Sequence, residues 1–401
     1  MKWKQLLNLG GVPGLLLLFY PVMMFFIARR RDTVGAYATV DASASIMILF
    51  SFAAFAVGLY YLFIRPRTRI GWRLLCSGPI LTLLIYHLWA WCTCLWSVDF
   101  KLSFFRAFEC ISFMLLIVAV FQELKKNVTD ELMVDWSMLF ITVNICSNLL
   151  LKLRMGAGIT PYATQYESTL FFFMALLYCK SFFQKYLTIT FAVLSMSTAG
   201  YAAMAGGSLF ILGGKNRNFV PYLLIFVLAG VVFSFVDYKE VLRVTVFRNH
   251  PEIVEKWDFA SNSSGRNTIH EIAFKAFKEH PVEGWGFVAC EPYISHKVAW
   301  GAGLISFHSG YLSALVGTGL VGLSFFVLFL FALLIKVMSK RIPNVYRPLV
   351  RSTFVVILAH TLSNPGIGTR VTGSWLPAFY LVTLISTLAL PKNTEQQRRL
   401  R

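Results

Sequence analysis

Apolar residues follow one another in long, nearly unbroken stretches along most of this chain. Runs of roughly 20 apolar residues are long enough for a helix to cross a lipid bilayer, and membrane β-barrels show an alternating pattern instead. The pattern therefore predicts an all-α polytopic membrane protein with about 12 transmembrane helices. We expect them at residues 11–28, 43–64, 74–93, 104–121, 132–151, 168–183, 186–199, 200–214, 219–236, 318–337, 349–363 and 374–390.

The composition supports this class. Of the 401 residues, 57% are hydrophobic and 14% are charged, whereas a soluble domain carries about 25% charged residues. No cleavable signal peptide is expected, because the first apolar run is too long and no small-residue cleavage site follows it. The seven cysteines are scattered, which predicts neither a disulfide framework nor a zinc site.

The net charge of +18 comes mostly from short loops beside the apolar runs. The positive-inside rule places such loops in the cytoplasm, so membrane topology accounts for the charge without nucleic acid. The basic loops lie at 65–73, 123–126, 215–217, 336–341 and 396–401. Both termini are then cytoplasmic, although the cluster at residues 29–31 would face outward.

This topology divides the chain into three parts. Residues 1–236 form transmembrane helices one to nine, residues 237–317 form a long extracytoplasmic loop, and residues 318–401 form three further helices and a basic cytoplasmic tail. The apolar stretches at 186–199 and 200–214 are each short for a crossing. If they formed a single helix, the basic loops after them would lie outside, so two helices fit better.

One polar segment of the long loop has the pattern of an amphipathic helix. In residues 265–280, apolar side chains recur every three or four residues. Ser263 or Ser264 can cap its start, and Pro281 marks its end. Arg266 would lie in the first turn, where free N–H groups and the guanidinium attract phosphate. The alternative is a solvated surface charge.

His308 stands where the loop meets the next apolar run, in the sequence HSGYLSALVGTGLVGL. An imidazole exchanges protons near neutral pH, so it can serve as a catalytic base. The alternative is a structural histidine at the membrane edge. Charged residues at the outer ends of other helices are candidates for the same cavity: Lys152, Arg154, Arg106 and Arg370. Arg106 can instead pair with Glu109, one turn away.

Three segments together resemble the O-antigen ligase and polymerase family of bacterial inner membranes. They are WSVDFKLSFFRAF (96–108), SGRNTIHEIAFKAFKEHPVEGWGF (264–287) and the stretch from His308 to Gly322. The third has a spacing similar to the motif of the ligase branch. The resemblance implies a helical membrane glycosyltransferase fold with one large periplasmic loop.

The resemblance also implies the chemistry. Such enzymes move a glycan from undecaprenyl diphosphate in the membrane to a hydroxyl group, which in ligases belongs to the lipid A–core. The reaction needs no metal and no cofactor. Arg266 matches the loop arginine that engages the diphosphate, and His308 matches the essential loop histidine. The family's arginine near the eighth helix has no counterpart in residues 195–207, and Arg154 or Arg370 is the expected substitute.

Two other functions stay open from the sequence. A repeat-unit polymerase of the same family would carry looser versions of these motifs. A transporter of lipid-linked glycans would also need a basic cavity and about twelve helices, but such proteins generally contain internal repeats, and none is apparent in this sequence.

Overall fold

We analysed a computed structural model of the chain. The structure describes residues 9–27, 41–64, 69–127, 129–154, 165–194, 198–212, 261–297, 307, 309–363, 366–371 and 375–390. All regular elements in these ranges are helical, as the apolar pattern predicts. The predicted helix at 219–236 lies outside the described residues.

Within the described ranges, five helices are long and apolar enough to cross a membrane: Ala42–Ile64, Gly78–Trp96, Phe100–Lys126, Asp130–Leu151 and Gly310–Val337. They comprise α4 (Ala42–Leu59) with η1 (Tyr60–Ile64), α6 (Gly78–Cys92) with η2 (Thr93–Trp96), α7 (Phe100–Asn127), α8 (Asp130–Arg154) and α17 (Gly310–Val337). The all-α polytopic membrane class is thus confirmed, whereas the described residues do not establish the count of twelve.

The other apolar stretches that the structure describes form shorter helices. They are α2 (Gly11–Ile27), α5 (Ile70–Leu75), α9 (Gln165–Tyr178), α10 (Phe182–Val193), α11 (Thr198–Leu212), α18 (Arg347–Ser363) and α19 (Trp375–Leu388), with η4 (Asn344–Tyr346) and η5 (Gly366–Gly368) between the last of them. Residues 182–212 form two helices rather than one, as the charge pattern favours.

α7 is the central helix of the molecule. In its most apolar window 83% of the residues are buried, against 33% in α4 and in α17. The exposed positions of the two outer helices carry large apolar side chains, such as Leu49, Phe52, Phe331 and Ile335. A contiguous apolar surface of this kind is suited to lipid rather than to water. α4 and α17 therefore present lipid-facing surfaces, and α7 holds the bundle together.

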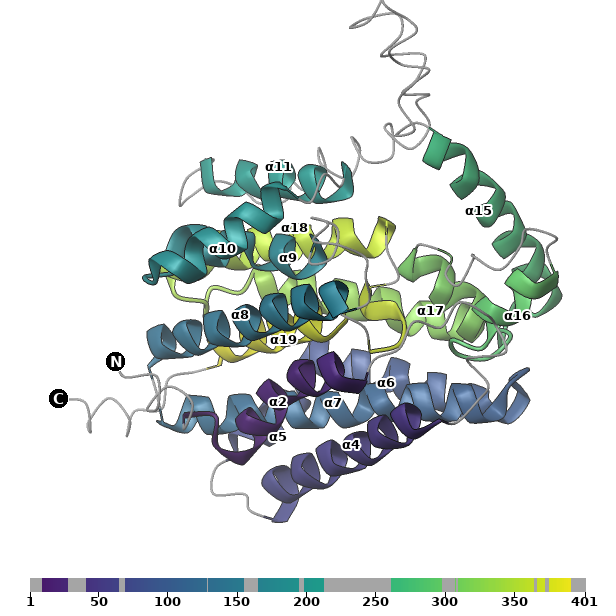
Figure 1. Cartoon of the computed structure of the whole chain (residues 1–401), viewed down its shortest axis with the longest axis horizontal. Coiled ribbons are helices and arrows are strands. Elements are labelled where there is room, and N and C mark those ends of the chain that lie inside the picture. The colour runs from purple at the N-terminus through teal and green to yellow at the C-terminus, as the bar shows by residue number, and fades with distance from the viewer. Residues whose placement is uncertain are drawn as a thin grey trace, which may run out of the picture.

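The polar segment of the long loop forms α15 (Ser261–Glu279) and α16 (Cys290–Lys297). Figure 1 shows both at one end of the helix layer, beside the start of α17. The predicted apolar face of α15 is confirmed, because Ala273 and Ala276 are buried against Phe307 and Val316. The loop helices are therefore docked on the membrane helices through a small apolar core.

Candidate active site

α17 is interrupted at Gly319, whose φ of 66° and ψ of −170° lie outside the helical region. An unbroken helix would join the N–H groups of residues 320 and 321 to the carbonyls four residues earlier. Residues 281–290, which we call the clasp, replace these partners. The N–H of Leu320 donates to the carbonyl of Pro281 at 2.9 Å, and the N–H of Val321 donates to that of Val282 at 3.4 Å. In return, the carbonyl of Val316 accepts the N–H of Trp285 at 2.9 Å, and the carbonyl of Gly317 accepts that of Gly286 at 3.0 Å.

The close approach of the clasp to the break depends on two glycines. A Cβ atom on Gly319 would lie 2.1 Å from the carbonyl oxygen of Val282, and one on Gly284 would lie 2.5 Å from the Gly319 nitrogen. Both glycines also have positive φ, which side chains disfavour. Glycine at positions 284 and 319 is therefore what allows the contact between the loop and α17.

The clasp also contacts the segment before α7. The Thr93 hydroxyl accepts the N–H of Phe287 at 3.0 Å, and the Ser103 hydroxyl donates to the carbonyl of Phe287 at 2.7 Å. Val98 donates to the carbonyl of Trp285 at 3.4 Å. The segment 96–108, the clasp and the start of α17, which carry the family resemblance, therefore meet at one place.

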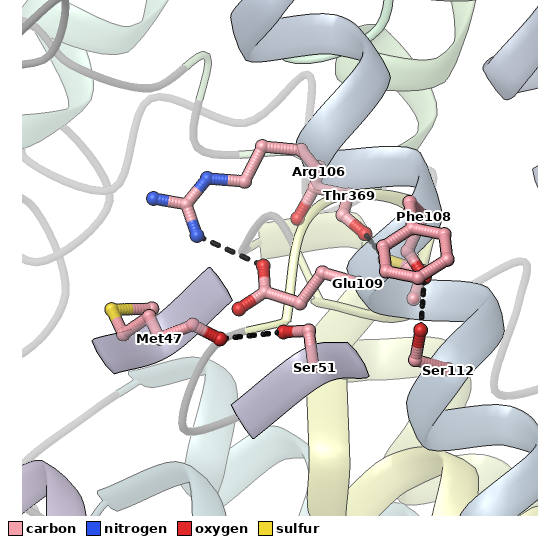
Figure 2. A network of polar contacts seen from close by, with 8 residues as sticks. Met47, Ser51, Arg106, Phe108, Glu109, Ser112 and Thr369 are labelled. Carbon is pink, nitrogen blue, oxygen red and sulfur yellow. Dashed lines mark hydrogen bonds and ion pairs between the residues drawn. The ribbon is translucent and has the colours of Figure 1, made fainter. Parts of the chain in front are cut away.

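A buried pair of opposite charges lies on α7 next to this place. Arg106 Nη1 donates to Glu109 Oε2 at 2.9 Å, with side chains 15% and 1% exposed. Figure 2 shows the Glu109 carboxylate turned toward the Arg106 guanidinium, near the α4 residues Met47 and Ser51. Among the described residues nothing hydrogen-bonds the buried Arg106 Nε or Glu109 Oε1. The alternative that the two residues pair with each other is confirmed, and the pair keeps one donor and one acceptor for a further group.

The charge of Arg370 acts on one carboxylate of α7 and on one of the loop helices. Arg370 follows η5, where the carbonyl of Gly368 accepts the Tyr86 hydroxyl at 2.6 Å and the carbonyl of Thr369 lies 3.5 Å from Cys110 Sγ. The two carboxylates belong to Glu109 and Glu291. Of the predicted site residues, Arg106 is paired with the buried Glu109, and the charge of Arg370 acts on the same carboxylate and on Glu291 of the loop.

Glu291 on α16 is buried, with 5% of its surface exposed. Its Oε1 accepts the Ser313 hydroxyl at 2.5 Å and the N–H of Phe307 at 3.5 Å. Burial raises the pKa of Glu291, while the Ser313 hydroxyl and then the charge of Arg370 act to lower it. Glu291 was not among the predicted site residues, although a single carboxylate in the apolar stretch 287–294 indicates a buried charge.

The proposed catalytic residues are only partly described. Arg266 is the sixth residue of α15, which begins at Ser261, so its predicted place in the first turn is wrong. The apolar periodicity fixes the face of a helix but not its first residue, and serines at 261, 263 and 264 offer several starts. The side chain of Arg266 and residue His308 lie outside the described residues.

Arg154, at the end of α8, contacts α2 rather than the Arg106–Glu109 pair. Arg154 Nη1 donates to the carbonyls of Phe25 and Phe26 at the end of α2, with 2.6 Å to Phe26, and its guanidinium lies 5.9 Å from the Phe25 ring centre. A cation is favourable at this end of a helix. The side chain of Lys152 lies outside the described residues. Arg154 is thus bound to the end of α2, whereas the charge of Arg370 acts on Glu291 of the loop.

These features define an all-α polytopic membrane protein whose polar loop is fastened to a broken transmembrane helix. Residues 186–327 match the family model described as O-antigen ligase, which confirms the family resemblance predicted from the motifs. The matched region includes α15, the clasp and the first half of α17. It supports an O-antigen ligase or a related polymerase activity in a bacterial membrane. The comparison with curated proteins found no match.

Proposed function

We propose that this protein is an O-antigen ligase. It would transfer an O-polysaccharide from undecaprenyl diphosphate to a hydroxyl group of the lipid A–core at the periplasmic face of the inner membrane. The observation that carries the proposal is the family match over residues 186–327. The matched segment contains the clasp, which fastens the loop to α17 just after position 308, and the His308–Gly322 spacing within it favours the ligase branch.

In this mechanism the donor lipid remains in the membrane and its diphosphate lies at the outer edge. Negative charge grows on the diphosphate as the bond from the sugar to oxygen breaks. Arg266 would stabilise that charge, and one such group contributes roughly 3 kcal/mol. His308 would accept the proton of the attacking hydroxyl, which contributes about 10²–10⁴-fold in rate.

Arg370 is the better candidate for the missing family arginine. Its charge already acts on buried carboxylates of α7 and α16, whereas Arg154 is hydrogen-bonded to the end of α2. We therefore assign the second diphosphate contact to Arg370, with Arg106 beside it. Lys152 and Arg154 would lie at the margin of the site, toward the lipid headgroups.

A deletion strain tests ligase against polymerase. If the protein is the ligase, the strain makes lipid A–core without O-chain and accumulates long lipid-linked polymer. Single repeats attached to the lipid A–core would instead identify a polymerase. Restoring the gene with His308→Ala should leave the deletion phenotype unchanged, while the wild-type gene should restore the O-chain.

Purified protein in detergent separates an enzyme from a transporter. With lipid-linked glycan and lipid A–core supplied together, an enzyme forms the joined product without a sealed membrane. A transporter forms none, because transport needs two compartments. Full activity of the His308→Ala variant in this assay would remove the assignment of the base.

A further inference from the structure

The Glu291 side chain accepts hydrogen bonds from residues on both sides of position 308. On one side it accepts the N–H of Phe307 at 3.5 Å. On the other side it accepts the Ser313 hydroxyl at 2.5 Å, and Ser313 donates its own N–H to the carbonyl of Ser309 at 3.0 Å. One buried carboxylate thus links the residue before position 308 to the first turn of the helix after it.

Glu291 is itself held at a fixed place. The N–H of the clasp residue Gly286 donates to the carbonyl of Gly317 in α17, and the carbonyl of Gly286 accepts the N–H of Cys290. The next residue, Glu291, donates its N–H to the carbonyl of Val288. Cys290 is fully buried next to Gly317. A continuous set of backbone contacts therefore runs from the break in α17 to the Glu291 side chain. Because the backbone of residues 286–291 is hydrogen-bonded to α17 and within itself, the position of the Glu291 carboxylate is restrained.

We propose that Glu291 is a positioning residue for the base at position 308. The inference rests on the proposed function, since it assumes that His308 takes the proton of the acceptor. Glu291 is buried and its Oε1 is already bound to Ser313 and Phe307, so it does not act on the substrate directly. It holds Phe307 and the first turn of α17, the described chain on both sides of position 308, in one arrangement. A displacement of a reacting group by about 1 Å can cost roughly 100-fold in rate.

The test is a double-mutant cycle of Glu291 and His308, with initial rates of glycan transfer measured in detergent. Glu291→Ala should lower kcat by about 100-fold and leave KM for the lipid-linked donor nearly unchanged. Because the two residues act on the same step, Glu291→Ala should lower the rate no further when His308→Ala is present. Glu291→Gln retains an oxygen acceptor and should lose less activity than Glu291→Ala.

Ser313→Ala is a second route to the same result, because it removes one of the two contacts and changes little volume. It should lower kcat by a smaller factor and should also show no further loss with His308→Ala. The control is Ser324→Ala, an exposed position on the same helix whose hydroxyl bonds only to the carbonyl of Leu320. This control should keep the wild-type kcat.

The outcomes separate the inference from the proposed function. If wild-type protein transfers glycan but the losses from Glu291→Ala and His308→Ala multiply, Glu291 has no positioning role and the inference is overturned. The same holds if Ser313→Ala has wild-type kcat. If wild-type protein transfers glycan neither to lipid A–core nor to a second lipid-linked repeat, the proposed function fails and the inference fails with it.

Discussion

At the scale of single residues, the Arg106–Glu109 pair is the most consequential charge contact in the described part of the chain. Its two side chains lie near the start of α7 and are largely removed from solvent. A buried ion pair contributes less to stability than its geometry suggests, because both charges lose their hydration. Removing one partner is costly, since the other charge is left buried. This asymmetry gives the pair a measurable signature.

We expect Arg106→Ala to destabilise the protein by about 3–5 kcal/mol. The double variant Arg106→Ala with Glu109→Ala should be destabilised by less than the sum of the single changes, because neither charge is then left unpaired. Thermal denaturation in detergent measures both. Equal and additive losses would show that the two side chains do not interact.

The Lys125–Asp130 pair is the matched control at the other end of α7. Its atoms are 2.7 Å apart, with side chains 10% and 14% exposed. Breaking it should lower stability without changing glycan transfer. Breaking the Arg106–Glu109 pair should lower both stability and glycan transfer, because Arg106 is proposed to lie beside the diphosphate. Transfer activity normalised to folded protein distinguishes the two pairs.

The charge of Arg370 gives a prediction about pH. Burial raises the pKa of Glu291, and Arg370 acts to lower it, so Arg370→Ala should raise that pKa further. A carboxyl whose pKa is higher in the folded state than in the unfolded state gains stability as the pH falls. We call the loss of unfolding free energy of Arg370→Ala relative to wild type its stability deficit. This deficit should therefore be largest near neutral pH and become smaller at acidic pH.

Melting temperatures in detergent from about pH 7 to pH 5 measure this trend. The charge of Arg370 acts on Glu109 as well, so the control background carries both Glu109→Gln and Glu291→Gln. In that background the deficit of Arg370→Ala should no longer depend on pH. A pH-dependent deficit that persists there would assign the effect to groups other than these two carboxylates.

At the scale of elements, the break in α17 decides how the loop is attached. Gly319→Ala should be strongly destabilising, because the new Cβ would meet the carbonyl oxygen of Val282 at 2.1 Å. The backbone conformation of Gly319, with positive φ and ψ near 180°, alone costs roughly 1–3 kcal/mol for a residue with a side chain. Gly78→Ala on α6 is the control, since its Cβ would lie 3.5 Å from Ala332. Detergent-solubilised yield and melting temperature should fall for the first variant only.

Much of this element-level structure could be predicted from the sequence. Long apolar runs predicted the membrane helices, and apolar periodicity predicted the buried face of α15. Both patterns follow from which side chains are removed from water. The glycines at 317, 319 and 322 are compatible with tight packing or with a bent helix, and they do not identify the segment that contacts the bend. The exchange of hydrogen bonds between the clasp and α17 joins residues more than 30 positions apart, and no local pattern encodes such a pairing.

The site was harder to predict than the fold for a similar reason. Arg106 and Arg370 were expected near one another only because both lie at the outer ends of helices. Glu291 was not expected at all, since its importance depends on Ser313 and Phe307, which reach it through tertiary packing. Charged residues at helix ends are common in membrane proteins. Which of them converge is decided by how the helices pack.

At the scale of the whole molecule, α17 sets the relation between the loop site and the membrane. It has 28 residues, so an unbroken helix of this length would span about 42 Å. The hydrocarbon core is about 30 Å thick, and the helix still continues for many turns beyond Gly319. The clasp and α15 lie at its first turns, and the basic segment 338–346 follows its last turn. These two regions should therefore lie on opposite sides of the bilayer.

Single cysteines in a variant without the seven natural ones test this topology in cells. Lys275→Cys lies on the exposed face of α15, and Lys340→Cys lies in the segment after α17. A maleimide that crosses only the outer membrane should label Lys275→Cys in whole cells, and should label Lys340→Cys only after lysis. The cysteine-free variant must first restore O-chain in the deletion strain. Labelling of Lys340→Cys alone in whole cells would place the loop in the cytoplasm, where the periplasmic transfer reaction is not possible.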